Sequence, residues 1–133
     1  MVEPDERSER ADVQEDPRAA DANLMRDISN AMVKLYRQQF GRGPEHVKTH
    51  YSGANAIVSI LGNSLTPVER TMREMGEVQR LRDVRLMFQH ATETQFREAV
   101  ERITGRRVIG FMSGIDVQND LCSEVFTLEP RID

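Results

Sequence analysis

The sequence contains the same order of local patterns twice. Each copy begins with a segment of helical apolar spacing, continues with a Gly-Arg pair and ends with two short apolar segments separated by a turn. One copy lies around Gly41-Arg42 and the other around Gly105-Arg106. Two strands that are joined by a short turn pair with each other in antiparallel fashion. The whole order, αββ-α-αββ, therefore predicts an α+β fold in which a four-stranded, mainly antiparallel sheet is packed with three helices.

The central helix has a strong start signal. Thr66 can accept a hydrogen bond from the backbone N–H of Glu69, Glu69 can accept one from Thr66, and Pro67 falls at the first helical position. Apolar residues three or four apart continue to about His90, which predicts one helix of about 24 residues. Gly76 weakens this helix by roughly 1 kcal/mol relative to alanine and would mark a bend or a close helix contact.

The remaining elements follow from apolar spacing and turn residues. Spacings of three and four predict a helix from Asn23 to Phe40, which Gly41 ends. A second capping-box pattern, Thr92-Glu93-Thr94-Gln95, predicts the start of the last helix, which Thr104-Gly105 ends. Alternating or continuous apolar patterns predict four strands, at residues 46–51, 55–61, 107–115 and 121–128.

The charges are unevenly distributed along the chain. Residues 1–20 contain seven acidic residues, three arginines and few large apolar side chains. They cannot bury enough apolar surface to offset chain entropy, so we predict a disordered acidic tail at 1–20 and a single domain at 21–133. The domain contains 15 acidic and 15 basic residues. Nucleic-acid binding depends on an excess of positive charge, so we expect no nucleic-acid partner.

The sequence also limits the compartment. No apolar run approaches the ~20 residues that a membrane-spanning helix needs, and the acidic N-terminus lacks the apolar core of a signal peptide. The one cysteine, Cys122, cannot form an internal disulfide, which fits a reducing compartment. We therefore expect a cytoplasmic protein without direct membrane insertion.

Arginines in the two Gly-Arg turns are the candidate binding residues. Arg42, Arg106 and Arg107 could bind an anionic ligand, because guanidinium groups pair with phosphate and carboxylate oxygens. The sequence Gly41-Arg42-Gly43-Pro44 follows a helix and precedes a strand, whereas a phosphate loop precedes a helix N-terminus. We therefore interpret it as a helix end and turn.

The other polar residues do not form a recognisable catalytic or metal site. His46 and His50 are about 13 Å apart on a strand, too far to share a metal ion. Cys122 has no base near it in the sequence, and paired carboxylates are lacking. Turn chemistry accounts for the two aspartates near the last hairpin turn, with a weak cation site as the alternative; the acids there are Asp116, Asp120 and Glu124. We expect no catalytic residues, no metal and no cofactor.

Several segments together resemble the MpsC family, a small bacterial family named for a component of a Na⁺-translocating, membrane-potential-generating system. The resemblance covers roughly residues 24–129 and depends on the order and spacing of its segments. The segments are Phe40-Gly41-Arg42-Gly43-Pro44, Leu65-Thr66-Pro67-Val68-Glu69-Arg70, Thr104-Gly105-Arg106-Arg107-Val108 and Val125-Phe126-Thr127-Leu128. The family name implies association with a membrane transport protein. Without a membrane span the chain cannot form the ion pathway, so the resemblance implies an accessory or regulatory subunit.

We therefore expect a non-catalytic accessory or regulatory module that acts by binding, and more specifically a homodimer. Strands 55–61 and 107–115 carry apolar residues on both faces and need cover on both. A long central helix would overhang the sheet, so either this helix or the apolar sheet face would lie in the dimer interface. A break at Gly76 that folds the helix back onto its own sheet is the competing explanation.

The alternative function is an anionic-ligand-binding protein or an enzyme at the Gly-Arg turns. Converging arginines in a deep pocket would favour that alternative, and a flat apolar face would favour protein binding.

Overall fold

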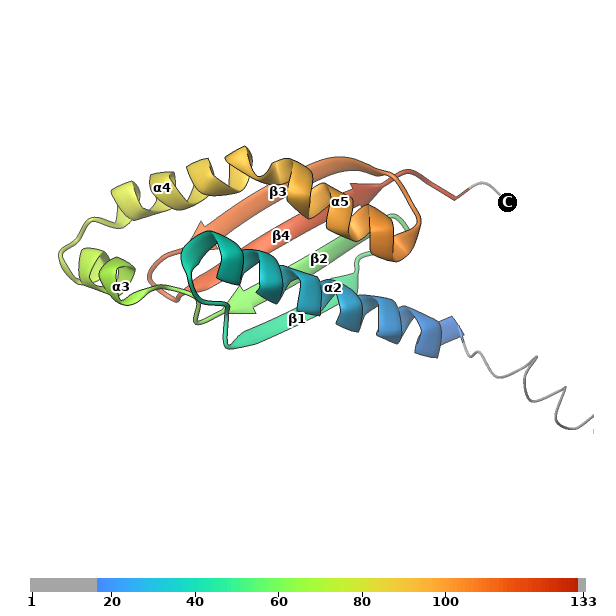
Figure 1. Ribbon diagram of the computed structural model, residues 1–133, viewed down its shortest axis with the longest axis horizontal. Helices are drawn as coiled ribbons and strands as arrows, with labels where there is room; N and C mark the ends of the chain where they lie inside the picture. Colours follow the sequence, from blue (N-terminus) through green and yellow to red (C-terminus); the bar gives the residue numbers. More distant parts are fainter. Residues whose placement is uncertain (1–16, 132–133) are drawn as a thin grey trace, which may run out of the picture.

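The computed structural model describes residues 17–131 (Figure 1). Its helices are α2 (Pro17–Phe40), α3 (Pro67–Glu74), α4 (Val78–Ala91) and α5 (Glu93–Thr104). Its strands are β1 (His46–Tyr51), β2 (Ala56–Gly62), β3 (Val108–Asp116) and β4 (Leu121–Leu128). This arrangement confirms the predicted α+β class. Residues 1–16 of the predicted acidic tail lie outside the described residues, and the boundary that we set at residue 20 falls inside α2.

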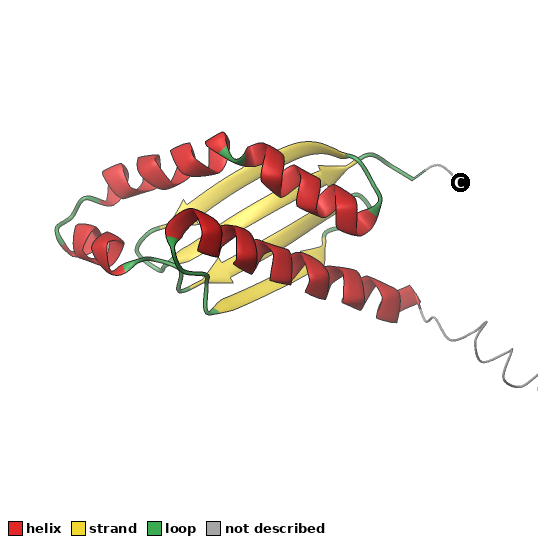
Figure 2. Cartoon of the chain, viewed as in Figure 1, coloured by secondary structure: helices red, strands yellow, loops and turns green. Residues whose placement is uncertain are grey.

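The four strands form one sheet in the order β1-β2-β4-β3, with every neighbouring pair antiparallel. Each hairpin places its two strands side by side, and the pairing of β2 with β4 joins the hairpins. The helices lie over one face of this sheet (Figure 2). The main core lies between the helices and that face. Its buried members are Ile28, Met32, Tyr36, Ile57, Leu61, Phe96, Val100, Val108, Cys122, Phe126 and Leu128.

The predicted central helix is divided into two helices, so the described residues contain four helices where we expected three. Its start is as predicted, because the Glu69 N–H donates to Thr66 Oγ1 at 3.2 Å and the Thr66 N–H donates to Glu69 Oε1 at 2.8 Å. Gly76 has a φ of 83°, which ends the first helix, because a left-handed residue cannot continue a right-handed helix. The break that we considered as the competing explanation is therefore present. It allows Leu65, Leu81 and Val117 to form a second small core at this end of the sheet.

The second capping box is not formed. Thr92 lies between α4 and α5, and its hydroxyl donates to the Phe88 carbonyl at 2.9 Å instead of accepting a bond from α5. The hydroxyl also accepts a bond of 3.0 Å from Gln39 Nε2, which joins the junction to α2. Tertiary contacts with α2 and the preceding helix thus replace the local cap.

Among residues 17–131, no helix lies on the opposite face of the sheet, and we call it the open face. Pairing in the sheet places residues that lie directly opposite one another on the same face, and the inward-facing residues of β4 are Cys122, Glu124, Phe126 and Leu128. The open face therefore consists of His46, Lys48 and His50 from β1, Ala56, Val58, Ile60 and Gly62 from β2, Leu121, Ser123, Val125 and Thr127 from β4, and Gly110, Met112, Gly114 and Asp116 from β3.

Candidate functional site

A row of polar side chains crosses the covered face of the sheet, between apolar rows. The paired residues Thr49, Ser59, Glu124 and Ser113 come from β1, β2, β4 and β3 in spatial order. Thr49 and Ser59 share a hydrogen bond of 2.8 Å, and Thr49 shares another of 2.8 Å with Ser29 of α2. Since buried polar groups are costly unless they are hydrogen-bonded, this row requires partners from both the strands and the helices.

Glu124 is the centre of this row and is completely buried. Its Oε2 accepts hydrogen bonds from the Tyr36 hydroxyl at 2.6 Å and from Gln89 Nε2 at 2.5 Å. The Ser113 hydroxyl donates to Oε1. Gln89 Nε2 also lies 2.9 Å from the Tyr36 hydroxyl. Helices α2 and α4 thus each supply a donor to a carboxylate of the sheet.

Burial raises the pKa of Glu124 from 4.5 to about 7, although the hydrogen bonds from Ser113 and Tyr36 favour the charged form. Burial and the nearby Glu124 carboxylate raise the pKa of Tyr36 well above 10.0. Burial also raises the pKa of the Cys122 thiol, which makes it a poor nucleophile. Glu124 is therefore a group that can gain or lose a proton near neutral pH.

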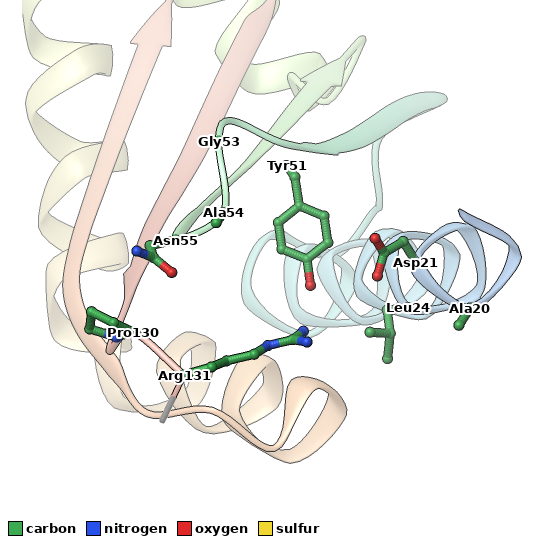
Figure 3. Close-up of a pocket in the computed structure, with 9 residues that line it drawn as sticks. All are labelled: Ala20, Asp21, Leu24, Tyr51, Gly53, Ala54, Asn55, Pro130 and Arg131. Carbon is green, nitrogen blue, oxygen red and sulfur yellow. The ribbon is translucent and has the colours of Figure 1, made fainter. Parts of the chain in front are cut away.

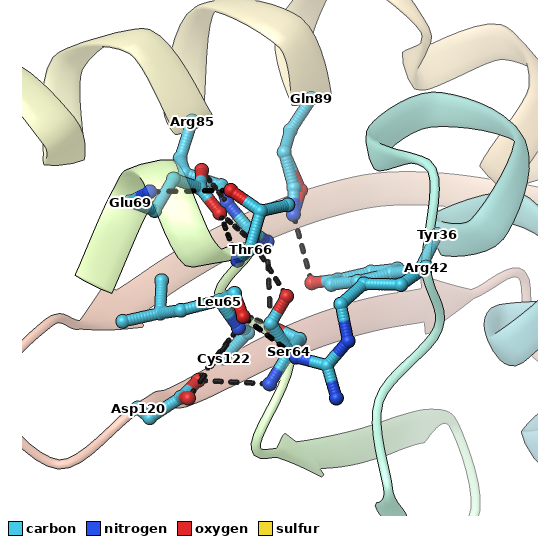
Figure 4. A network of polar contacts seen from close by, with 10 residues as sticks. All are labelled: Tyr36, Arg42, Ser64, Leu65, Thr66, Glu69, Arg85, Gln89, Asp120 and Cys122. Atoms are coloured by element: carbon cyan, nitrogen blue, oxygen red, sulfur yellow. Dashed lines mark hydrogen bonds and ion pairs between the residues drawn. The ribbon is translucent and has the colours of Figure 1, made fainter. Parts of the chain in front are cut away.

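A second polar cluster surrounds Arg85 of α4, which is 1 % exposed (Figure 4). Its Nε and Nη2 bind the two carboxylate oxygens of Glu69 at 2.7 and 2.6 Å. It also donates to the Ser64 carbonyl at 2.9 Å and lies 3.8 Å above the centre of the Phe40 ring. Burial raises the pKa of Glu69, but the bonds from Arg85 outweigh this effect and leave the pKa below 4.5. The pair is therefore charged at neutral pH.

The loop between β2 and α3 is held from both sides. Asp120 Oδ1 accepts bonds from the backbone N–H groups of Ser64 at 2.9 Å and Leu65 at 3.2 Å. Arg42 Nη1 donates to the Leu65 carbonyl at 2.6 Å. Figure 4 shows these residues converging beneath Arg85. Because each of these groups has a partner inside the fold, the cluster stabilises the loop and has no free group that faces a ligand.

Ser113 lies between Glu124, to which it is hydrogen-bonded, and a hollow in the surface. A surface hollow of about 260 Å³ is lined by Ser113 and Phe111 of β3, by Leu86 and His90 of α4, and by Glu93. Ser113 thus both lines this hollow and binds Glu124 through its hydroxyl. Gain or loss of a proton by Glu124 is the chemistry that this arrangement permits. It contains no activated nucleophile of the kind that acyl or phosphoryl transfer requires.

The predicted arginine site is not assembled in one place. Arg42 lies at the end of the sheet where β2 ends, whereas Arg106 and Arg107 lie at the end where β2 begins. Arg106 donates to the Ala54 carbonyl at 2.9 Å, to Asn55 Oδ1 at 2.6 Å and to the Glu129 carbonyl at 3.0 Å. Arg107 is exposed. Arg42 and Arg106 therefore bind backbone carbonyls of neighbouring loops at opposite ends of the molecule.

Another hollow, of about 810 Å³, lies between the start of α2, the turn after β1 and the residues after β4 (Figure 3). The Tyr51 hydroxyl is buried without a hydrogen-bond partner among the described residues, and Figure 3 shows it pointing into this hollow. Asp21 and Arg131 also line it. The surface is mixed in polarity and contains no cluster of titratable groups of one kind.

The acidic residues of the last hairpin form the predicted turn. Asp116 accepts bonds from the Asn119 backbone at 3.2 Å and side chain at 2.9 Å, and these bonds lower the pKa of Asp116. Asp120 binds the loop before α3, and Glu124 points to the core. Within residues 17–131, no three His, Cys, Asp or Glu side chains are grouped to hold a metal ion.

Our sequence analysis missed Glu124, Tyr36, Gln89 and Arg85 as a group. One signal was available, because Glu124 alternates with Cys122 and Phe126, which places it on the buried face of its strand. Arg85 and Gln89 similarly follow Leu81 at intervals of four on the inner face of α4. No local pattern indicates that these residues meet, since Tyr36 and Glu124 are 88 positions apart.

Comparison with known proteins gives the family. The family described as "Na+-translocating membrane potential-generating system (MpsC)" matches residues 20–130. The chain belongs to the MpsC family. One relative of this MpsC-family chain is the uncharacterized protein YrhF of Bacillus subtilis (strain 168), which is 25 % identical over 115 residues, 80 % of this chain and 88 % of the relative. No solved structure is significantly similar to this MpsC-family chain. No helix among its described residues is long and apolar enough to cross a membrane.

Proposed function

We propose that the chain is a non-catalytic accessory or regulatory module of a membrane-potential-generating system. It acts in the cytoplasm by binding to itself and to another protein, a component of the transport system. The MpsC description supports the association with such a system. The buried polar groups bind one another, which supports a structural role for them in place of catalysis.

The open face of the sheet carries this proposal. It exposes large apolar side chains that the described residues leave uncovered, including Met112 at 59 %, Ile60 at 42 % and Leu121 at 42 %. Contiguous apolar surface of this kind is typical of protein interaction sites. Within residues 17–131, the outer face of strands that we expected to need cover on both faces is thus uncovered, while Arg42 lies at the opposite end of the sheet from Arg106 and Arg107.

A photocrosslinking residue in the native host tests the proposal. At position 112, in the open face, it should form crosslinks to protein, whereas at position 98, on exposed Glu98 of α5, it should form few. An integral membrane protein, or a subunit bound to one, among the products supports the link to transport. Products at position 112 that contain only soluble proteins remove that link. The absence of any product at position 112 overturns the binding function.

A second candidate function is binding of an anionic ligand beside Arg106 and Arg107. The observation that favours it is a hollow of about 450 Å³ that these two residues line together with Arg131. Inorganic phosphate should then raise the thermal midpoint of the wild type more than that of Arg107→Gln. Equal midpoints with and without phosphate contradict this function.

A further inference from the structure

We infer that the open face binds a second copy of this chain about a twofold axis that runs parallel to the strands. The inference rests on the proposed function, because it names the occupant of the same surface and its orientation. With this axis, β1 of one copy lies over β3 of the other, and β2 lies over β4. Each row of paired residues then faces the same row of the second copy in reverse order.

The sizes of the side chains favour this arrangement. One row of the open face contains Lys48, Ile60, Ser123 and Gly114, in the order β1-β2-β4-β3. Large side chains occupy one half of the row and small ones the other half. Reversal places Ile60 over Ser123 and Lys48 over Gly114, so that large residues face small ones, as close packing requires.

The next row supports the same orientation. It contains His50, Val58, Val125 and Met112. Reversal stacks Val58 of each copy on Val125 of the other at the centre of the interface. His50 then packs against Met112 at both edges, which is an apolar contact with a polar ring at its rim.

The charges distinguish this axis from the alternative. The basic side of the open face lies on β1, with Lys48 and two histidines, and its acidic residue is Asp116 at the end of β3. An axis across the strands would place β1 over β1 and bring the two Lys48 side chains together. The axis along the strands brings β1 over β3, so that Lys48 and His46 approach Asp116 of the second copy.

Sheet twist modifies the edges but preserves the pairing. Packed sheets cross at about 30°. An edge strand lies about 7 Å from the centre of its sheet, so this angle shifts it along the facing strand by roughly one residue. Lys48 therefore lies between Gly114 and Asp116 of the second copy. Hydrogen bonds from Asn119 lower the pKa of Asp116, which keeps its carboxylate charged at neutral pH.

The size of the face is sufficient for a weak dimer. Four strands about 4.8 Å apart and about seven residues long cover roughly 450 Å² in projection for each copy. The accessible area of the protruding side chains is larger than this projection. The interface therefore falls at the lower end of the range for specific complexes, roughly 1,000 Å² in total.

Charge reversal in separate chains tests the orientation. Lys48→Glu alone places like charges opposite each other at both symmetric contacts of its homodimer, and Asp116→Lys alone does the same. A heterodimer of the two variants has opposite charges at both contacts. Native mass spectrometry of an equal mixture should therefore show heterodimer several-fold above each homodimer, and more than the statistical proportion. Raising the salt concentration should return the mixture towards that proportion.

Two controls complete the experiment. Lys34→Glu mixed with Glu98→Lys alters exposed charges on the helical side and should mix statistically. Asp116→Asn is the second control, in case Asp116→Lys disturbs the turn, because asparagine keeps an acceptor for Asn119. In a mixture of Asp116→Asn with Lys48→Glu, the amount of heterodimer should still exceed the amount of Lys48→Glu homodimer.

The outcomes separate the inference from the proposed function. If Lys48→Glu and Asp116→Lys form heterodimers and homodimers in statistical proportion, the proposed axis along the strands is wrong, although the chain still binds to itself. A chain that stays monomeric at micromolar concentration overturns the second copy as occupant. The self-binding part of the proposed function then fails as well, whereas its other part, the binding of another protein, holds if the photocrosslinker at position 112 captures such a protein and fails if that residue captures none.

Discussion

Glu69 and Arg85 form a bidentate ion pair that joins the first turn of α3 to the buried side of α4. Glu69 also accepts the N–H of Thr66 in the capping box, so one carboxylate both starts a helix and neutralises a buried cation. The pair lies where the chain folds back at Gly76, and it fixes the two halves of the predicted central helix against each other.

The first prediction concerns this pair. Glu69→Gln retains an oxygen for the Thr66 N–H but removes the charge, which leaves Arg85 buried and unpaired. We expect a loss of about 3–5 kcal/mol in the free energy of unfolding, measured by urea denaturation. Thr66→Ala, which removes only the cap, should cost about 1 kcal/mol. Adding Arg85→Met to Glu69→Gln should recover part of the loss; an equal or greater loss would show that the charge is not the cause.

The second prediction concerns the break at Gly76. Alanine in a helix interior is more stable than glycine by about 0.5–1 kcal/mol, but a left-handed alanine is less stable by about 1–2 kcal/mol. Since Gly76 has a φ of 83°, Gly76→Ala should lower the urea midpoint. Gly76→Asn should lower it less, because asparagine tolerates this conformation. A higher midpoint for Gly76→Ala would indicate a continuous helix.

The third prediction is a pH dependence from Glu124. Its pKa is about 7 in the folded chain, against a reference of 4.5. Below pH 4.5 both states are protonated; as the pH rises from 4.5 to 7, only the unfolded state loses the proton. The contribution of Glu124 to stability therefore falls across this window, by roughly 3 kcal/mol in total, and is constant above it.

Glu124→Gln removes this titration. Relative to wild type, the variant should gain stability between pH 5 and pH 7.5, measured by urea denaturation at both values. Glu98→Gln, at an exposed position on α5, should show no such gain. An equal difference between Glu124→Gln and wild type at both pH values would mean that Glu124 does not titrate in this range.

The fourth prediction distinguishes the two surfaces that our sequence analysis offered for a dimer. Val58→Asp places a carboxylate at the centre of the open face, where burial of an unpaired charge opposes association. Light scattering at micromolar concentration should give a monomeric mass for it. Met75→Asp, at a residue 69 % exposed between α3 and α4, should remain dimeric. The reverse result would place the interface at the helices.

Local patterns of the sequence were sufficient for the four strands and the fold class, but not for the division of the predicted central helix into α3 and α4. The capping box of Thr66 and Glu69, the left-handed Gly105 after α5 and the alternation along β4 all depend on residues a few positions apart. Such interactions need no distant partner, although tertiary contacts can replace them, as they do at Thr92. They therefore predicted the two hairpins and the α+β class, although the effect of Gly76 remained open between a bend and a break.

Tertiary structure alone decided which groups meet. Tyr36 and Gln89 reach Glu124 across 88 and 35 positions, and Arg42 and Arg106 follow similar turns yet lie at opposite ends of the sheet. These outcomes depend on the pairing of β2 with β4 and on the placement of every helix over one face. Periodicity shows that a strand has two apolar faces, but burial of the whole chain determines which face the helices cover and which stays open.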